Sequence, residues 1–345
     1  MRSSVVGLPF AIAVLVGCSS RPSPKETVMP APGGADQPGT PGSDASDGGV
    51  VDPPSPPADM STSGPPTAGD GALTANQKAV AEAMTSIWEN DTPVLAYGYA
   101  ENIKDGRGYT SGRAGFCTGT GDAIQVIDCY DQLRTAANGN LMVKYMPALT
   151  TINQKFMSSG QDQGDTSLLD AVGSWVNDWG ASYNSAATQA DFKKCQDQIS
   201  DALYYRPAMQ AATKVGLTRA LTRAALYDMW INQGDAALVS QTNSALGVTS
   251  TIGHGVTEDQ WLQKFVELRR DLLAGDKTWA TSVDRVAGYE KARRRGNWDL
   301  SQPIDSGVKA SQCWPAGSYK DSQYSSYVIN PDATWSKSTT ASGCQ

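Results

Sequence analysis

Apolar residues return every three to four positions along most of the chain from residue 73 onward. In the first such stretch Val80, Met84 and Ile87 fall on one face, which is the pattern of an amphipathic helix. Thr74 stands just before it and has a glutamine three positions later, as in a capping box. This pattern predicts a first helix over residues 75–89.

The same spacing predicts further helices and leaves few strand signals. The expected helices cover residues 122–133, 141–153, 167–179, 189–203, 206–215, 217–232 and 257–274. Strand signals are confined to the glycine-rich residues 99–115. The predicted fold class is therefore mainly α with a small β element (α+β).

Two of these helices carry a charge on their apolar face. Asp228 falls on the stripe that begins at Leu217, and Arg269 follows Phe265 by four positions on another. A buried single charge costs several kcal/mol unless it is paired. We therefore expect Asp228 and Arg269 to pair inside the fold. The alternative is that each side chain turns to the edge of its helix and is solvated.

Residues 1–17 have one early cation, Arg2, followed by a short apolar run. The run is too short for a permanent membrane span and is typical of a cleaved signal peptide. It ends in Leu15-Val16-Gly17-Cys18, which resembles the lipobox of bacterial lipoproteins. We expect lipidation of Cys18 and an extracellular or cell-surface location, with full secretion after ordinary signal cleavage as the alternative.

Residues 18–72 are rich in Pro, Gly, Ser and Asp and contain few large apolar side chains. Such a segment cannot offset its ordering entropy by burial. We expect a disordered tether that holds the folded residues 73–330 away from the membrane. Residues 331–345 would form a C-terminal tail.

The number and spacing of the cysteines are consistent with an exported protein that contains disulfides. Five remain besides Cys18, an odd number, so one is expected to be free. No pair has the C-x-x-C spacing that is usual in zinc and redox sites. Cys313 and Cys344 bracket a polar segment in which a disulfide would stabilise most, and a bond between Cys129 and Cys195 is a second hypothesis.

Composition and motifs narrow the chemistry. The net charge of −7 argues against a nucleic-acid partner, because phosphate binding needs a basic surface. A Ser-His-Asp triad would depend on the one histidine, His254, and no GxSxG element accompanies it. The metalloprotease motif HExxH and the phosphate-binding motif GxxxxGK[ST] are both absent from the sequence. Paired carboxylates remain.

Two carboxylates fit general acid and base catalysis. Glu89 comes at the expected end of the first helix, where partially negative carbonyls disfavour an ionised carboxylate and raise its pKa. Asp105 lies near Lys104 and Arg107, two cations that favour its ionised form. Such different surroundings are the expected signature of an acid and a base. On spacing alone, a frayed helix end and a turn former are the alternatives.

Three stretches carry a distinctive order of residues. They are Glu89-Asn90, then Tyr99-Ala100-Glu101-Asn102-Ile103-Lys104-Asp105-Gly106-Arg107-Gly108-Tyr109-Thr110, then Gly115-Phe116-Cys117-Thr118-Gly119-Thr120-Gly121-Asp122. They resemble glycoside hydrolase family 46, the chitosanases of the lysozyme-like superfamily. A weaker correspondence extends over about residues 73–330.

The resemblance implies a two-lobed lysozyme-like fold with the active-site cleft between the lobes. It implies an inverting endo-hydrolysis of β-1,4 bonds in chitosan, with Glu89 as general acid, Asp105 as general base and Thr110 holding the attacking water with Asp105. It also implies groove residues and a charge network behind the acid. The groove residues are Tyr99, Glu101, Arg107 and Asp122, and the network residues are Asp228, Arg269 and Arg285.

No cofactor and no metal are implied. The expected partners are chitosan and glucosamine oligosaccharides, with the membrane reached only through the lipid anchor, no nucleic acid, and a monomeric protein. Two alternatives remain. One is a lysozyme-like peptidoglycan hydrolase, and the other is a surface lipoprotein that binds amino sugars without cutting them.

Overall fold

The structure is a computed structural model that describes residues 72–234, 236–277, 279–322, 324–338 and 343–345. From Leu73 onward these residues belong to one compact unit. The expected signal peptide, Cys18 and nearly all of the expected tether lie outside the described residues. Among the described helices, none combines the length and the apolarity that a membrane crossing requires.

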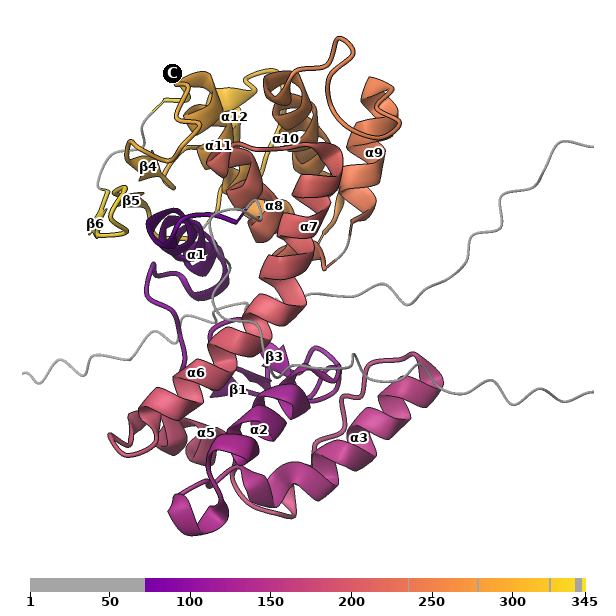
Figure 1. The fold of residues 1–345 in the computed structure, drawn as a ribbon, viewed down its shortest axis with the longest axis vertical. Helices are drawn as coiled ribbons and strands as arrows, with labels where there is room; N and C mark the ends of the chain where they lie inside the picture. Colours follow the sequence, from indigo (N-terminus) through magenta and orange to yellow (C-terminus); the bar gives the residue numbers. More distant parts are fainter. Residues whose placement is uncertain (1–71, 235, 278, 323, 339–342) are drawn as a thin grey trace, which may run out of the picture. The chain divides into compact units, whose positions relative to one another are not determined.

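The elements of this unit fall into two lobes (Figure 1). The first lobe contains β1 (Ala100–Glu101), β2 (Thr110–Ser111), β3 (Phe116–Cys117), α2 (Asp122–Leu133), the short turns η1 (Ala136–Asn138) and η2 (Val143–Tyr145), α3 (Met146–Ser159), α4 (Ser167–Asp170) and α5 (Trp175–Asn184). The second lobe contains α1 (Ala75–Asn90), α8 (Ala220–Gln233), α9 (Ala237–Leu246), α10 (Glu258–Gly275), η4 (Ala280–Ser282), α11 (Asp284–Arg294), α12 (Ala310–Cys313), β4 (Ile304–Asp305), β5 (Tyr327–Ile329) and β6 (Trp335–Lys337). The predicted α+β class is confirmed.

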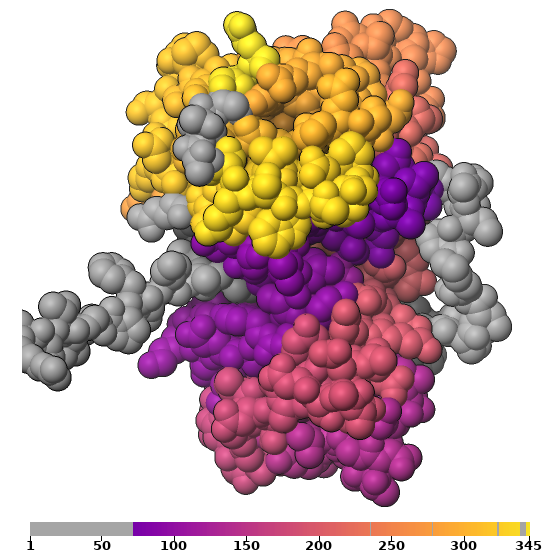
Figure 2. Space-filling view, turned by 90° about the vertical axis from the view of Figure 1, so that its left-hand side faces the viewer, coloured from indigo at the N-terminus to yellow at the C-terminus, as the bar shows by residue number. Residues whose placement is uncertain are grey.

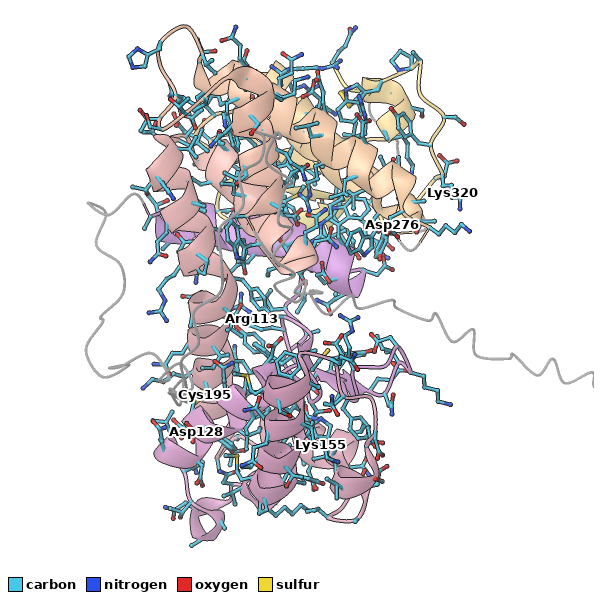
Figure 3. All side chains as sticks on the ribbon, turned by 90° about the vertical axis from the view of Figure 1, so that its right-hand side faces the viewer. Arg113, Asp128, Lys155, Cys195, Asp276 and Lys320 are labelled. Carbon is cyan, nitrogen blue, oxygen red and sulfur yellow. A yellow bond between two sulfur atoms is a disulfide. The ribbon has the colours of Figure 1, made fainter. Side chains whose placement is uncertain are left out.

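One helical run joins the lobes. It consists of α6 (Gln189–Ser200), the π-helical turn η3 (Asp201–Tyr205) and α7 (Arg206–Val215), and it passes from the first lobe into the second (Figure 1). Arg113, where the two lobes meet in Figure 3, forms ion pairs with Glu82 of α1 and with Asp197 of α6. The guanidinium of Arg113 therefore links an element of each lobe to the run between them.

The second lobe is built around α8, which is buried along its whole length. It packs against α1, α7 and α11. The capping box at the start of α1 is present, because Oγ1 of Thr74 accepts from the backbone N–H of Gln77 and the side chain of Gln77 accepts from the backbone N–H of Thr74. The helix predicted over residues 75–89 is observed over Ala75–Asn90, so its C-terminal end differs by one residue.

Two sheets flank the helices. β1, β2 and β3 form an antiparallel sheet in which Thr110 pairs with Cys117. Gly108, just before β2, has a φ of +77°, and a Cβ there would lie 2.3 Å from Oγ1 of Thr118. This close approach of the two strands requires glycine. The second sheet, β4-β5-β6, contradicts the expectation that strands are confined to residues 99–115.

Several helices differ from the predicted ones. Residues 167–179 form α4 and α5 with a break at Gly173, where the chain passes close to Lys144 and Tyr145. Residues 141–153 instead form η2 and α3, which continues to Ser159. Helices α9, α11 and α12 were not predicted. Helix α11 is mostly buried although it contains several charged residues, so it lacks the apolar stripe that identifies a helix in sequence.

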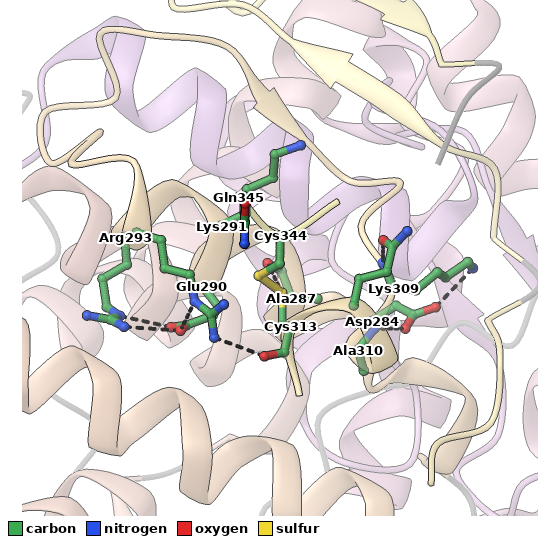
Figure 4. The surroundings of a disulfide bond; sticks show 12 residues. Asp284, Ala287, Glu290, Lys291, Arg293, Lys309, Ala310, Cys313, Cys344 and Gln345 are labelled. Carbon is green, nitrogen blue, oxygen red and sulfur yellow. Dashed lines mark hydrogen bonds and ion pairs between the residues drawn. A yellow bond between two sulfur atoms is a disulfide. The ribbon is translucent and has the colours of Figure 1, made fainter. Parts of the chain in front are cut away.

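Two disulfides are present in the described residues. Cys129–Cys195 joins α2 to α6, and Cys313–Cys344 joins α12 to the end of the chain (Figure 4). Both expected pairs are confirmed. Cys117, the fifth described cysteine, is also disulfide-bonded, so no described cysteine is free and the expected free thiol is wrong.

Candidate active site

Glu89 lies in the last turn of α1 and is almost fully buried, with 4% of its surface exposed. Nη1 of Arg285, on α11, donates to Oε1 of Glu89 at 2.6 Å. The helix ends just beyond, because Asp91 adopts the left-handed conformation with a φ of 54°. The end of α1 thus holds the Glu89 carboxyl in the interior, beside α11.

Burial raises the pKa of the Glu89 carboxyl above its ordinary value, because its charged form is poorly solvated there. The positive charge of Arg285 opposes this shift without reversing it. The direction agrees with the expectation from sequence. The main cause is different, since burial outweighs any effect of the helix end.

Behind Glu89 lies a buried charge network. Oδ2 of Asp228 accepts from Nη1 of Arg269 and from Nε of Arg285, both at 2.7 Å. Burial would raise the pKa of Asp228, but the two guanidinium groups outweigh it and hold that pKa below its ordinary value. Arg269 also donates from Nε to Oε1 of Gln233 at 3.1 Å. The ion pair expected from the helix faces is therefore present, and Arg285 connects it to Glu89.

Asp105 lies in a different environment, in the exposed turn between β1 and β2. Its Oδ1 accepts from the backbone N–H of Arg107 at 3.1 Å, and its Oδ2 accepts from Nε of the same residue at 3.0 Å. Lys104, just before it, has a φ of 58°. The turn and the Arg107 side chain therefore fix the direction of the Asp105 carboxylate. Glu89 and Asp105 are held by different arginines, one in the interior and one at the surface.

Thr110 is buried on β2, five residues beyond Asp105. Its Oγ1 lies 3.5 Å from Sγ of Cys117, its neighbour across the sheet. The hairpin formed by β1 and β2 thus carries both Asp105 and Thr110. Tyr99 precedes β1, and its hydroxyl donates to Oε2 of Glu101 at 3.0 Å. Burial first, and then the bond to Glu101, raise the pKa of the Tyr99 hydroxyl.

A pocket lies between the lobes. Its lining residues are Thr120, Asp122, Phe156, Asp162, Leu203, Tyr204 and Gly234. Asp122 is the first residue of α2, and its Oδ2 accepts from the hydroxyl of Tyr204 at 3.1 Å. Gly234 follows α8 of the second lobe, whereas Asp122 and Asp162 belong to the first.

Sequence reasoning missed Asp162 and Tyr204 as lining residues. Burial raises the pKa of Asp162 above its ordinary value, with a smaller opposing effect from Arg107. Asp162 lies in an irregular polar segment, and Tyr204 lies in the π-helical turn η3. Neither place has a periodic pattern that would identify it. Among the described residues, no group of three or more His, Cys, Asp or Glu side chains could hold a metal ion.

Comparisons of sequence find relatives over most of this unit. The sequence profile of glycosyl hydrolase family 46 matches residues 83–304. A curated chitosanase of Bacillus subtilis (strain 168) is 37% identical over 245 residues, which cover 67% of this chain and 82% of the relative. A curated chitosanase of Streptomyces sp. (strain N174) is 30% identical over 244 residues, which cover 69% of this chain and 81% of the relative.

Solved structures give the same result. A mutant chitosanase from Bacillus subtilis MY002, complexed with 6 GlcN, has a TM-score of 0.60 at 33% identity, covering 75% of this chain and 100% of that chain. A chitosanase of Gynuella sunshinyii, complexed with chitotetraose, has a TM-score of 0.57 at 33% identity, covering 70% of this chain and 96% of that chain. The arrangement of the two lobes is therefore similar to that of solved relatives.

Proposed function

The chain belongs to glycosyl hydrolase family 46, and on that premise we propose that it is an endo-acting, inverting chitosanase. One observation carries the mechanism. The chain has both a buried carboxyl with a raised pKa, Glu89, at the end of α1, and an exposed carboxylate, Asp105, on the hairpin of the other lobe. Such a contrast suits a proton donor and a base.

Glu89 is the general acid that protonates the leaving glycosidic oxygen. Its raised pKa keeps the proton on the carboxyl to higher pH than on an ordinary glutamate, as a proton donor requires. Asp228 bonds to the same guanidinium of Arg285. Because its negative charge raises the pKa of Glu89, Arg285 favours the ionised form of Glu89 less than it would alone. Once the proton has left, the new carboxylate of Glu89 already has its partner at hydrogen-bond distance.

Asp105 is the general base. It removes a proton from water, which attacks the anomeric carbon from the face opposite the leaving group and so inverts its configuration. Room for that water requires the two carboxyl groups to be roughly 6.5 to 9.5 Å apart, or more in an open cleft. Arg107 directs the Asp105 carboxylate, and Thr110, on the same hairpin, holds the water with it.

The substrate is a polymer of glucosamine. Its ammonium groups are matched by carboxylates of the groove, Glu101, Asp122 and Asp162, through charge-assisted hydrogen bonds. Tyr99 and Arg107 complete the groove beside the hairpin. Two relatives of similar fold are complexed with 6 GlcN and with chitotetraose, which supports this substrate class.

The decisive experiment is a reducing-sugar assay on deacetylated chitosan, chitin and peptidoglycan, with Glu89→Gln as the control. We expect turnover of chitosan by the wild type alone. Turnover of peptidoglycan alone would exclude a chitosanase, and no turnover of any polymer would favour a protein that only binds amino sugars. The anomeric form of the first product, followed by NMR, tests the inverting mechanism.

The anchor is a separate part of the proposal. The lipobox-like Leu15-Val16-Gly17-Cys18 supports lipidation of Cys18 and an enzyme held at the cell surface by residues 18–72. A monomeric state is proposed separately. Mass spectrometry of the mature N-terminus should find a lipid on Cys18, and light scattering of the detergent-solubilised protein should give a monomer. A Cys18 whose sulfur is held in a disulfide, or a mature chain without lipid, would support full secretion instead.

A further inference from the structure

The residues that follow α12 return to the end of α1. Asp91 caps that end, two positions after Glu89. Ser325 donates to both of its carboxylate oxygens, from the backbone N–H to Oδ1 at 2.5 Å and from Oγ to Oδ2 at 3.1 Å. The hydroxyl of Tyr327 donates to the backbone carbonyl of Asp91 at 3.2 Å. Figure 2 shows the C-terminal residues, in yellow, against the indigo residues of α1.

Tyr324 contacts Trp88, the residue just before Glu89. Its ring meets the ring of Trp88 edge-on, with the centroids 5.1 Å apart. Trp88 is buried, with 3% of its surface exposed. Burial first, and then the negative charge of Glu89, raise the pKa of the Tyr324 hydroxyl. Tyr324 therefore lies near enough to Glu89 to be affected by its charge.

The same part of the chain also holds the helix that carries Arg285. Asp284, the residue before it, accepts three bonds at its carboxylate. The donors are the backbone N–H of Ala310 at 2.7 Å, Nζ of Lys309 at 3.0 Å and the backbone N–H of Ser322 at 3.2 Å. Figure 4 shows the first two of these bonds beside the disulfide. Asp284 is 2% exposed, so these bonds lie in the interior.

The segment that makes these contacts is fixed at its own ends. Tyr327 belongs to β5, which pairs with β4 and β6. Cys313 is bound to Cys344 (Figure 4). The backbone carbonyl of Cys313 accepts from Nη2 of Arg294, on α11, at 2.9 Å. The segment that contacts α1 and α11 is therefore fixed by a sheet and by a disulfide.

We propose that Lys309, Ala310, Ser322, Tyr324, Ser325 and Tyr327 form a C-terminal clamp that positions Glu89 against Arg285 for catalysis. The clamp residues bond to Asp91, two positions after Glu89, and to Asp284, one position before Arg285. None of its members needs to touch the substrate. Its role rests on the proposed function, in which Glu89 is the proton donor.

The clamp has a measurable consequence. It keeps the end of α1 packed against α11, so water has little access to the Glu89 carboxyl. If the end of α1 is released, the carboxyl becomes better solvated and its pKa moves down towards the ordinary value. An acid that loses its proton at lower pH leaves the enzyme inactive at lower pH, so the alkaline limb of the pH–rate profile moves down.

Asp91→Ala removes the side-chain acceptor for Ser325. Asp91→Asn keeps one side-chain oxygen that can accept from the backbone N–H of Ser325. On chitosan, we expect Asp91→Ala to lower kcat by about tenfold or more with KM nearly unchanged, and to move the alkaline limb to lower pH. Asp91→Asn should recover most of both. Ser325→Ala, which removes only the Oγ bond, is a milder variant that keeps the test valid if Asp91→Ala fails to fold.

Asp332→Ala is the matched control. Asp332 is an exposed carboxylate of the same C-terminal part, and among the described residues it accepts from the backbone N–H and the hydroxyl of Thr334. It should leave kcat and the alkaline limb as in the wild type. Asp91 and Ser325 variants that lose thermal stability but keep the wild-type alkaline limb and kcat would overturn the clamp.

A second measurement does not depend on activity. NMR titration of the Glu89 carboxyl carbon should give a lower pKa in Asp91→Ala than in the wild type. If the wild type cuts no chitosan, the proposed function fails while this titration still tests the clamp. If the wild type cuts chitosan and the titration curves coincide, the clamp fails alone.

Discussion

Arg285 donates to Glu89 at 2.6 Å from Nη1 and to Asp228 at 2.7 Å from Nε, so one guanidinium serves both carboxyl groups. Burial affects the two carboxyls in the same sense, yet their pKa values move in opposite directions. The difference lies in the number of cations each contacts, since Asp228 bonds to Arg269 as well. The network therefore keeps Asp228 ionised and leaves Glu89 able to carry a proton.

Removing either catalytic carboxyl should lower turnover by orders of magnitude while the fold is retained. Glu89→Gln and Asp105→Asn should each lower kcat on chitosan by about 10²- to 10⁴-fold, the usual contribution of an acid or a base. Steady-state kinetics together with circular dichroism measure this, and Asp128→Asn, at an exposed site on α2, is the matched control. Near wild-type turnover by Asp105→Asn would exclude it as the base.

Asp228→Ala should destabilise the protein strongly, because it leaves the buried Arg269 and Arg285 without a shared carboxylate. We expect the free energy of unfolding to fall by about 3 to 5 kcal/mol, the cost of breaking a buried ion pair. Urea unfolding measures it, with Asp128→Ala as the exposed control. Equal unfolding midpoints for Asp228→Ala and the wild type would mean that water solvates this network in solution.

The raised pKa of Glu89 makes stability depend on pH. The folded protein keeps this proton to higher pH than the unfolded chain, whose glutamate pKa is about 4.3. The stability from this group is therefore fully present below that pH and is lost as pH rises through the folded value. Glu89→Gln should show a flatter decline of Tm than the wild type on the alkaline side of pH 4.3. Parallel Tm curves would contradict the shift.

The two disulfides should differ little in their contribution to stability. The loop closed by Cys129–Cys195 spans 66 residues and that closed by Cys313–Cys344 spans 31, and loop-closure entropy gives about 4 kcal/mol for each. Replacing each pair by alanines and measuring urea midpoints tests this. A loss below about 1 kcal/mol for Cys313→Ala/Cys344→Ala would show that the sheet alone fixes the C-terminal part.

Asp162 should contribute to substrate binding, because it lines the same pocket as Asp122. Asp162→Asn should raise KM for chitosan by about tenfold with a smaller effect on kcat, the loss expected of one charge-assisted hydrogen bond. Asp165→Asn, three residues further along and not among the residues that line the pocket, is the control. An unchanged KM in Asp162→Asn would remove it from the groove.

The sequence alone located the helices whose apolar faces are regular, together with Glu89 at the end of the first and Asp105 in a glycine-rich turn. It also predicted that Asp228 and Arg269 pair, because two charges on apolar stripes have few other ways to be buried. These features depend on neighbours within one element, or on a simple requirement that buried charge be compensated.

The tertiary structure decided what spacing does not encode. Helix α11 has no apolar stripe. Two of its buried charged residues have partners from other elements, since Arg285 pairs with Glu89 and Asp228, and Asp284 accepts from residues between Lys309 and Ser322. The attachment of Ser325 to Asp91 joins positions 234 residues apart. The shift of the Glu89 pKa likewise comes mainly from burial, and burial is set only when the remote elements pack together.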